Sequence, residues 1–458
     1  MRLISIPQFL RFRTPGPLLA AMLAVACWLP QPAGALDGAP MPAPDGPVAA
    51  ESRRWSLARL IQAAQASHPS VRSQQALLAA AEAGVESARW QYFPTPSISV
   101  QTASVGQGDT QYGGDRSVTV LALSQPLWTW GRLDAGQERA RAQRDAALAG
   151  QDEARLGIAL RLVQAWGEWQ SAQLRLEAIE AGMRLHERLL RQVQRRLEEG
   201  QAAASDFGLA EGRLAGVRAD RVQARLQEAS ARERLALLSG QPLPAGALAL
   251  PSESELSAIS GGDATGWLDR IEDASPVLAR LRAQWRQQQA SVAELEARLK
   301  PEISARLETQ RGNFSVAGAA PQTRAFIGIA SQFGPGLSSL SVVTEALRRL
   351  ESAQAELEAQ RLALAEQVAT DRQLLAVAPA RRAELARAIG SAGSVLQSWD
   401  RQYLAGRKTW QDLMGAAREQ VQAQVQLAEF DAATLVAAWR LALLAGAAEQ
   451  PGRQERQP

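Results

Sequence analysis

Two stretches of the sequence share one spacing, Glu199-Gly200-Gln201-Ala202-Ala203-Ala204-Ser205-Asp206 and Ala405-Gly406-Arg407-Lys408-Thr409-Trp410-Gln411-Asp412. Both stretches place an aspartate six residues after a glycine, and a further glycine, Gly240 or Gly446, follows forty residues after the first. Glycine readily adopts the left-handed backbone that ends a helix. Each stretch therefore predicts a turn between two helices, and the constant offset of 206 residues predicts two copies of one structural plan.

Long helix-compatible segments precede both turns, from about Arg132 to Glu199 and from about Ser338 to Leu404. At 1.5 Å per residue each helix would be roughly 100 Å long. A second helix, to Leu238 or Leu444, is predicted after each turn, so each copy ends in an antiparallel helical hairpin. Pro379 is predicted to kink or split the second long helix.

Apolar residues in the first long helix follow the alternating three- and four-residue spacing of a coiled coil. The predicted seam consists of Leu176, Ile179, Met183, His186, Leu190, Val193 and Leu197. We interpret His186 as a packing residue on this seam rather than a metal ligand.

A strand hairpin is predicted before each long helix, because apolar and polar residues alternate there. The predicted strands are Ser97 to Gln101, Ser117 to Leu123, Ile303 to Glu308 and Phe326 to Ile329. Four strands cannot close a barrel, and open sheet edges are not viable in lipid. If these strands span a membrane, several chains must share one barrel.

The N-terminus has the features of a secretory leader, with Arg2, Arg11 and Arg13 before an apolar run and Ala33-Gly34-Ala35 after it. The only cysteine, Cys27, lies inside this leader and is expected to be removed with it; lipidation of Cys27 is the alternative. The predicted organisation is a signal peptide (1–35), an N-terminal linker (36–54), repeat 1 (55–241), a linker (242–263), repeat 2 (264–446) and a C-terminal tail (447–458).

The composition favours extended helices over a thick globular core, since 46% of the residues are hydrophobic but only 5% aromatic. The net charge is +3 with acids interspersed among the arginines, so no nucleic-acid site is expected. His68 and His186 are the only histidines, and the sequence contains no phosphate loop, nucleophile motif or metal-ligand pair. We therefore expect neither an enzyme nor a bound cofactor or metal.

The order of leader, helix, hairpin, long helix, glycine turn and helix, repeated twice, resembles the TolC outer-membrane factor family. The most specific stretches are Ala88-Arg89-Trp90-Gln91-Tyr92-Phe93-Pro94-Thr95-Pro96-Ser97 and Gln125-Pro126-Leu127-Trp128-Thr129-Trp130-Gly131. The resemblance implies a mostly α fold with a small β part. It also implies an outer-membrane homotrimer, in which twelve shared strands form a transmembrane β-barrel that a coiled-coil tunnel continues across the periplasm.

In that family the two glycine turns are periplasmic tips that bind an adaptor. The tip residues implied here are Gly200, Gln201, Ser205, Asp206, Gly406, Arg407, Lys408, Thr409 and Trp410. Asp412 matches the first of two aspartates that constrict the pore in some members, whereas Gly415 replaces the second. Helix capping is the alternative for Asp206 and Asp412, and Trp128 and Trp130 are expected either to anchor at the membrane interface or to pack at the helix start.

The stretch from Ser398 to Leu413 resembles the branch that exports large surface adhesins by type I secretion. That resemblance implies a membrane-fusion adaptor, an inner-membrane ABC transporter, a secreted protein cargo and outer-membrane lipid as partners. Two alternatives remain open, a multidrug-efflux outer-membrane factor and a periplasmic coiled-coil adaptor or structural protein.

Overall fold

The computed structural model describes residues 55–104, 110–246, 248, 267–331 and 338–446, all within one compact unit. The predicted signal peptide with Cys27, the 36–54 linker, most of the 242–263 linker and the 447–458 tail lie outside the described residues. The domain boundaries given above stay predictions.

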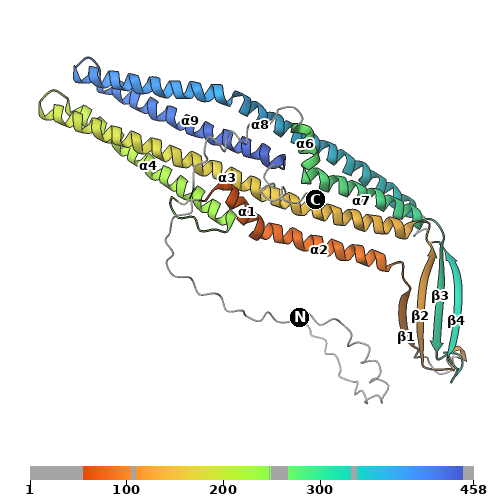
Figure 1. Cartoon of the computed structure of the whole chain (residues 1–458). Coiled ribbons are helices and arrows are strands. Elements are labelled where there is room, and N and C mark those ends of the chain that lie inside the picture. Colours follow the sequence, from red (N-terminus) through yellow and green to blue (C-terminus); the bar gives the residue numbers. More distant parts are fainter. Residues whose placement is uncertain (1–54, 105–109, 247, 249–266, 332–337, 447–458) are drawn as a thin grey trace, which may run out of the picture. The chain divides into compact units, whose positions relative to one another are not determined.

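The described chain is mostly helical and runs through one order of elements twice (Figure 1). The first copy comprises α2 (Pro69–Trp90), β1 (Thr95–Thr102), β2 (Ser117–Trp128), α3 (Arg132–Glu198) and α4 (Ala204–Ser239). The second comprises α7 (Pro276–Arg298), β3 (Glu302–Arg311), β4 (Gln322–Ala330), α8 (Ser338–Leu404) and α9 (Trp410–Leu444). Additional elements are α1 (Leu57–Ser67), α6 (Trp267–Ala274) and a short 3-10 turn, η2 (Thr110–Tyr112). The predicted fold class and its internal repeat are confirmed.

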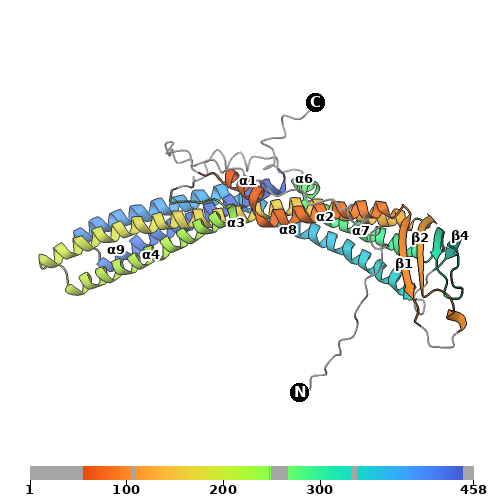
Figure 2. The same cartoon turned by 90° about the horizontal axis from the view of Figure 1, so that it is seen from below.

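The long helices lie side by side in a layer (Figures 1 and 2). Along its length α3 packs against α2 and then α4 on one side, and against α7 and then α9 on the other. The second long helix, α8, packs against α7 and α9. The layer therefore reads α2 or α4, then α3, then α7 or α9, then α8.

The four strands form one antiparallel sheet in the order β1-β2-β3-β4. Each strand directly follows or precedes one helix of the layer, so strands and helices have the same lateral order. The central pairing of β2 with β3 joins the two repeats, from Thr119↔Arg311 to Trp128↔Ile303, with a bulge between Pro126 and Trp128. The strands extend beyond their predicted ends because the polar residues at those ends still pair through their backbones.

The main hydrophobic core lies where α1 crosses the middle of α3. Leu57, Leu60 and Ile61 of α1 pack into a cluster with Leu162 and Trp166 of α3. The same cluster includes buried residues near the ends of α4 and α9. This core holds α1 against one face of the helix layer.

Two glycines of α3 allow α9 to approach closely. A Cβ atom built on Gly167 would lie 2.3 Å from Cγ2 of Val436, and one on Gly182 would lie 2.7 Å from Cγ2 of Val421. Contacts this short are sterically excluded, so a side chain at either position would force the facing valine or the helix to move.

The buried stripe of α3 corrects the predicted seam. Its members are Ile179, Gly182, His186, Leu189 and Val193, whereas Met183 and Leu190 are only half-buried. Gly182 is buried because its lack of a side chain lets α9 pack closely against α3. A search for apolar side chains at coiled-coil spacing does not detect this role. His186, 8% exposed, donates from Nδ1 to the Gly182 carbonyl at 2.8 Å, as expected of a packing residue.

Pro379 lies inside α8, which continues from Ser338 to Leu404 without interruption. The prediction that proline splits this helix is therefore wrong. Proline removes one backbone donor from the helix, but the helix retains its register on both sides, where α8 packs against α7 and α9.

We expect Gly167→Ala to destabilise the protein by about 1–3 kcal/mol, because the new methyl group would overlap Val436. Gly157→Ala is the matched control, since no atom lies within 4 Å of a Cβ at that position of the same helix. There alanine should be neutral or stabilising by up to about 1 kcal/mol. Thermal unfolding of the purified variants measures both effects, and Val436→Ala should partly rescue Gly167→Ala.

Candidate functional site

Both predicted tips are helix ends with the same backbone geometry. Gly200 and Gly406 have φ values of +72° and +71°, in the left-handed region that glycine favours. In the first tip the N–H groups of Gly200 and Gln201 donate to the carbonyls of Leu197 and Arg196 at 3.0 and 2.7 Å. The second tip repeats this pattern, as Gly406 donates to Tyr403 at 3.0 Å and Arg407 to Gln402 at 2.9 Å. Each long helix therefore ends in a Schellman motif.

The second tip continues into a capping box at the start of α9. The Asp412 N–H donates to Thr409 Oγ1 at 3.2 Å, while Asp412 Oδ2 accepts from the Thr409 N–H at 3.2 Å and from its hydroxyl at 2.8 Å. These bonds to Thr409 lower the pKa of Asp412, and Lys408, whose Nζ lies 3.8 Å away, contributes to the same shift. Asp412 is thus ionised at neutral pH and engaged in its own helix end.

The first tip lacks this arrangement. Ala203 stands at the N-cap of α4 and has no side chain to accept a bond. Asp206 lies in the first turn of α4, where the helix dipole favours a negative charge, but its carboxylate makes no hydrogen bond or ion pair within the described part of the chain. A hydrogen-bonded cap therefore exists at Asp412 and not at the equivalent Asp206.

Arg196 of α3 joins the two tips. Its guanidinium donates to the carbonyls of Tyr403 and Leu404 at 2.9 and 2.6 Å and stacks on the Tyr403 ring at 4.7 Å. These carbonyls belong to the last turn of α8, so Arg196 caps a helix of the other repeat. Sequence reasoning missed this residue, although an arginine in the last turn of α3 was the available signal.

An apolar core lies between the two tips. Its buried residues include Leu189 and Val193 of α3 and Trp410 and Leu413 of α9. The rings of Trp410 and Tyr403 are 5.7 Å apart. Of the predicted tip residues, Trp410 is therefore buried in this core, while Gly200, Gln201, Arg407 and Thr409 are exposed at its surface.

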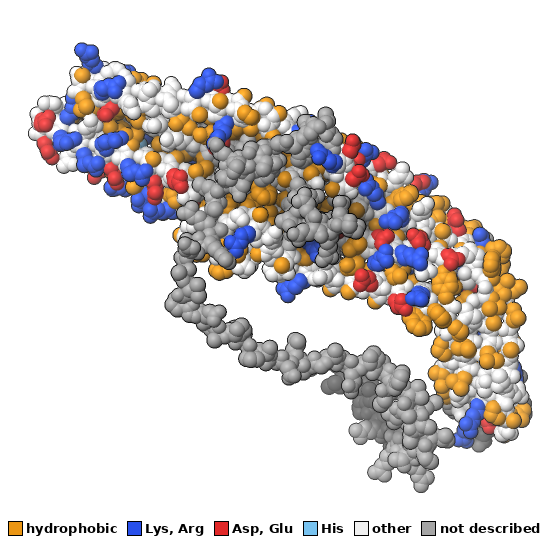
Figure 3. All heavy atoms as spheres, viewed as in Figure 1, with side chains coloured by type: hydrophobic (Ala, Val, Ile, Leu, Met, Phe, Trp, Pro, Cys, Tyr) orange, Lys and Arg blue, Asp and Glu red, His pale blue; other side chains and the backbone are white. Residues whose placement is uncertain are grey.

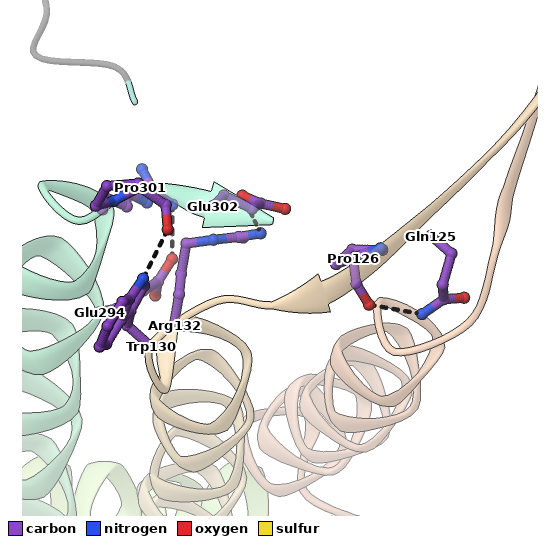
Figure 4. Close-up of polar contacts among 8 residues, drawn as sticks. Gln125, Pro126, Trp130, Arg132, Glu294, Pro301 and Glu302 are labelled. Atoms are coloured by element: carbon purple, nitrogen blue, oxygen red, sulfur yellow. Dashed lines mark hydrogen bonds and ion pairs between the residues drawn. The ribbon is translucent and has the colours of Figure 1, made fainter. Parts of the chain in front are cut away.

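The opposite end of the long helices carries the sheet and the other predicted residues, Trp128 and Trp130. Their rings meet edge to face at 5.9 Å and are about half exposed, at 55% and 47%. Trp130 Nε1 donates to the Pro301 carbonyl at 2.6 Å (Figure 4). Beside it, Arg132 Nη2 pairs with Glu302 at 3.0 Å, so this junction also joins the two repeats (Figure 4).

The register gives the sheet one largely apolar face and one face on which polar residues predominate. Ile98, Leu121, Leu307 and Ile327 share the apolar face and are exposed. Figure 3 shows hydrophobic side chains at the surface of the sheet. The opposite face carries Ser97, Ser99, Gln101, Ser124, Ser304, Arg306, Glu308, Gln322 and Arg324, together with the apolar residues Val118, Val120, Ala122 and Phe326. An exposed apolar sheet face of this kind indicates a surface that does not contact water in the working protein.

Aromatic pairs lie beyond both ends of the strands. Trp90 and Phe93 pack at 5.2 Å near the helices, and Tyr112 and Phe314 pack at 5.8 Å in the hairpin loops. In the loops Asp115 Oδ1 and Oδ2 accept backbone N–H groups of Gly318 and Asn313 at 3.0 and 2.9 Å, which lowers the pKa of Asp115. Asp115 thereby holds the two hairpin ends together.

Among the helices of the described ranges, none combines the length and hydropathy needed to cross a membrane. Within those same ranges, no group of three or more His, Cys, Asp or Glu side chains is placed to hold a metal ion.

Comparisons with known proteins identify the fold. Residues 60–241 match the model of the family described as outer membrane efflux protein. Among solved structures, the fold is similar to that of CusC, with 17% identity, a TM-score of 0.76, and coverage of 85% of this chain and 91% of that chain. The outer-membrane channel OprN is 22% identical, with a TM-score of 0.72 and coverage of 85% of this chain and 89% of that chain. VceC from Vibrio cholerae is 17% identical, with a TM-score of 0.73 and coverage of 85% of this chain and 96% of that chain. Curated protein sequences gave no match.

We expect Asp412→Ala to loosen the start of α9, because it removes the two hydrogen bonds that Asp412 Oδ2 accepts from Thr409. Asp206→Ala is the matched control, since the equivalent carboxylate makes none. Hydrogen exchange of the first turns of α9 and α4 compares the two variants. Because the pKa of Asp412 is lowered, the contribution of the wild-type cap should be complete above the ordinary pKa of 3.8 and be lost as the pH falls through the lowered pKa of the folded state. Equal exchange in both variants would contradict this assignment.

Proposed function

We propose that this chain is the exit duct of a tripartite export system. Its residues 60–241 match the model of the family described as outer membrane efflux protein, and its fold is similar to that of outer-membrane channels. In this proposal three copies form a tunnel that begins in the periplasm and opens across the outer membrane. The family is one of transport proteins, which fits the expectation that the chain is not an enzyme.

The observation that carries the proposal is the exposed apolar face of the sheet. A water-soluble protein would hide such a face in a core, whereas lipid-facing strands alternate apolar residues outward with polar residues inward. Aromatic pairs beyond both strand ends fit the two interfaces of a bilayer. In this arrangement Trp128 and Trp130 lie at the periplasmic interface, and the loops held by Asp115 lie outside the cell.

The lateral order of the elements supports assembly into a ring. The sheet ends at β1 on one side and β4 on the other, and the helix layer ends at α2 and α4 on one side and α8 on the other. These edge helices carry large exposed apolar residues, among them Leu77 and Val222 on one side and Leu362 and Val377 on the other. Head-to-tail contact of unlike edges generates a closed ring. Three copies, the number implied by the family resemblance, would give twelve strands.

The tips are the proposed docking site of a periplasmic membrane-fusion adaptor. Gly200, Gln201, Ser205, Asp206, Gly406, Arg407, Lys408, Thr409 and Trp410 form or support this surface, with buried Trp410 shaping it from beneath. Asp412 would line the entrance, although its oxygens already serve the capping box. An inner-membrane ABC transporter would supply the energy.

We propose a large secreted adhesin as cargo, on the resemblance of Ser398 to Leu413 to the type I secretion branch. Multidrug efflux is the second candidate, because the matched family is described by efflux and has the same fold. A periplasmic adaptor is disfavoured, since it gives no reason for four strands with an exposed apolar face.

Replacing Ile98 by arginine should prevent assembly of the protein in the outer membrane. The new charge would face lipid in mid-strand, which costs about 2–4 kcal/mol per chain at the bilayer midplane. Ser99→Arg is the matched control, because this neighbour lies on the polar face of the same strand. Heat-modifiable trimers in outer-membrane fractions report assembly. Equal assembly of the two variants, or recovery of the wild type in the soluble periplasm, would rule out the proposed barrel.

Deletion of the gene separates the two candidate cargoes. The secretion duct predicts loss of a surface adhesin and of biofilm with unchanged drug tolerance, restored by the wild-type gene. Increased drug susceptibility with a normal cell surface would favour efflux instead.

A further inference from the structure

A groove lies along α3 between α4 and α9. Near the tips it encloses about 770 Å³, with Ile179 and His186 of α3 at its base and the small residues Gly212, Gly216 and Gly415 in its walls. A second hollow of about 840 Å³ continues it along the helices, and the two share Arg175, Gln223 and Gln227. Together they form one continuous groove.

The groove lies on the face of the helix layer opposite α1. On α3 it is lined by Gln164, Glu168, Ser171 and Arg175, whereas Leu162, Trp166 and Trp169 pack in the core with α1. Two residues of offset correspond to about 200° around a helix. Figure 2 shows α1 on one side of the layer. If α1 faced inward it would fill the tunnel, so the groove is the surface that lines the tunnel in the proposed trimer.

Charges along the groove fall into two classes. Arg234 pairs with Glu168 at 2.5 Å, and Arg440 pairs with Asp371 at 3.1 Å. Within each of these pairs the positive and negative charges cancel.

The other charged residues lining the groove are Arg175, Arg213, Arg418 and Asp220, and none of them has a side-chain hydrogen bond or ion pair to another described residue. Arg213, Arg418 and Asp220 are exposed, and Arg175 is half-buried. After pairing, the groove therefore retains three arginines against one aspartate in each chain. Most of this excess lies near the tips, where Arg418 is one turn beyond Gly415.

We propose that these three arginines make the periplasmic part of the tunnel selective for anions, so that its cargo is acidic. This inference rests on the proposed function, because it requires the groove to line a tunnel. A ring of three copies would bring nine guanidinium groups around one axis, and a water-filled channel with low-dielectric walls concentrates ions of opposite charge. Asp412 does not offset this excess, since its carboxylate is engaged with Thr409 and Lys408.

The test is the reversal potential of the full-length trimer in planar bilayers under a KCl gradient at low ionic strength, where charges are least screened. The wild type should favour chloride over potassium. Replacing Arg175, Arg213 and Arg418 together by glutamine should shift the reversal potential toward that of potassium, and Arg418→Glu alone should shift it in the same direction.

The matched control replaces Arg184, Arg188 and Arg191 by glutamine. These residues are also exposed and unpaired on α3 but do not line the groove. The control removes the same charge and should leave selectivity unchanged. Heat-modifiable trimers establish that every variant is assembled.

Potassium selectivity of the wild type, or an equal shift in the control, would overturn the inference while leaving the duct intact. Assembled trimers that conduct no current would overturn the duct itself, and the anion filter with it.

Discussion

The unpaired edges of the sheet are the constraint on which the architecture depends. β1 and β4 end a sheet whose apolar face is exposed, and hydrocarbon offers no hydrogen bonds to edge N–H and C=O groups. In the proposed barrel the edges would pair with one another in neighbouring copies. Because strands and helices follow the same lateral order, closing the sheet in this way would also bring α8 of one copy beside α2 and α4 of the next. One pairing requirement would thus organise both the proposed membrane part and the helical part.

Duplication provides the plan, and residues unique to each copy join the two halves. The glycine turns are equivalent, but only the second tip has a capping box, and at the tips Arg196 of the first repeat bonds the last turn of α8 in the second. At the other end, Trp130 and Arg132 of the first repeat bond Pro301 and Glu302 of the second. Polar contacts therefore join the repeats at both ends of the long helices, and apolar packing together with the Arg280–Glu153 ion pair joins them between the ends.

Local chemistry explains what the sequence could predict. Glycine turns, long helices and strand hairpins follow from backbone preference and hydrophobic period, so their order was predictable without tertiary information. The buried position of Gly182 was not predictable, because glycine has no side chain to enter a hydrophobic pattern and is buried here only because α9 packs closely against it. Arg196 was not, because its acceptors lie more than 200 residues away in the chain. The tip residues were located by their equivalence to the glycine turns, whereas the engagement of Asp412 and the isolation of Asp206 depend on the residue three positions earlier.

Net charge illustrates the same limit at the scale of the whole chain. A value of +3 spread over 458 residues indicates a nearly neutral protein, and acids and arginines alternate along the helices. In the folded chain some of these charges are paired and others are not. Between α3 and α4, Glu180 pairs with Arg225 and Glu187 pairs with Arg218. Such pairing engages acidic side chains at helix contacts, so the positive charges of Arg175, Arg213 and Arg418 along the groove have no acidic partner among the described residues. In the proposed tunnel these uncompensated charges would dominate the potential that a passing ion meets, because the charges of a close ion pair largely cancel at a distance.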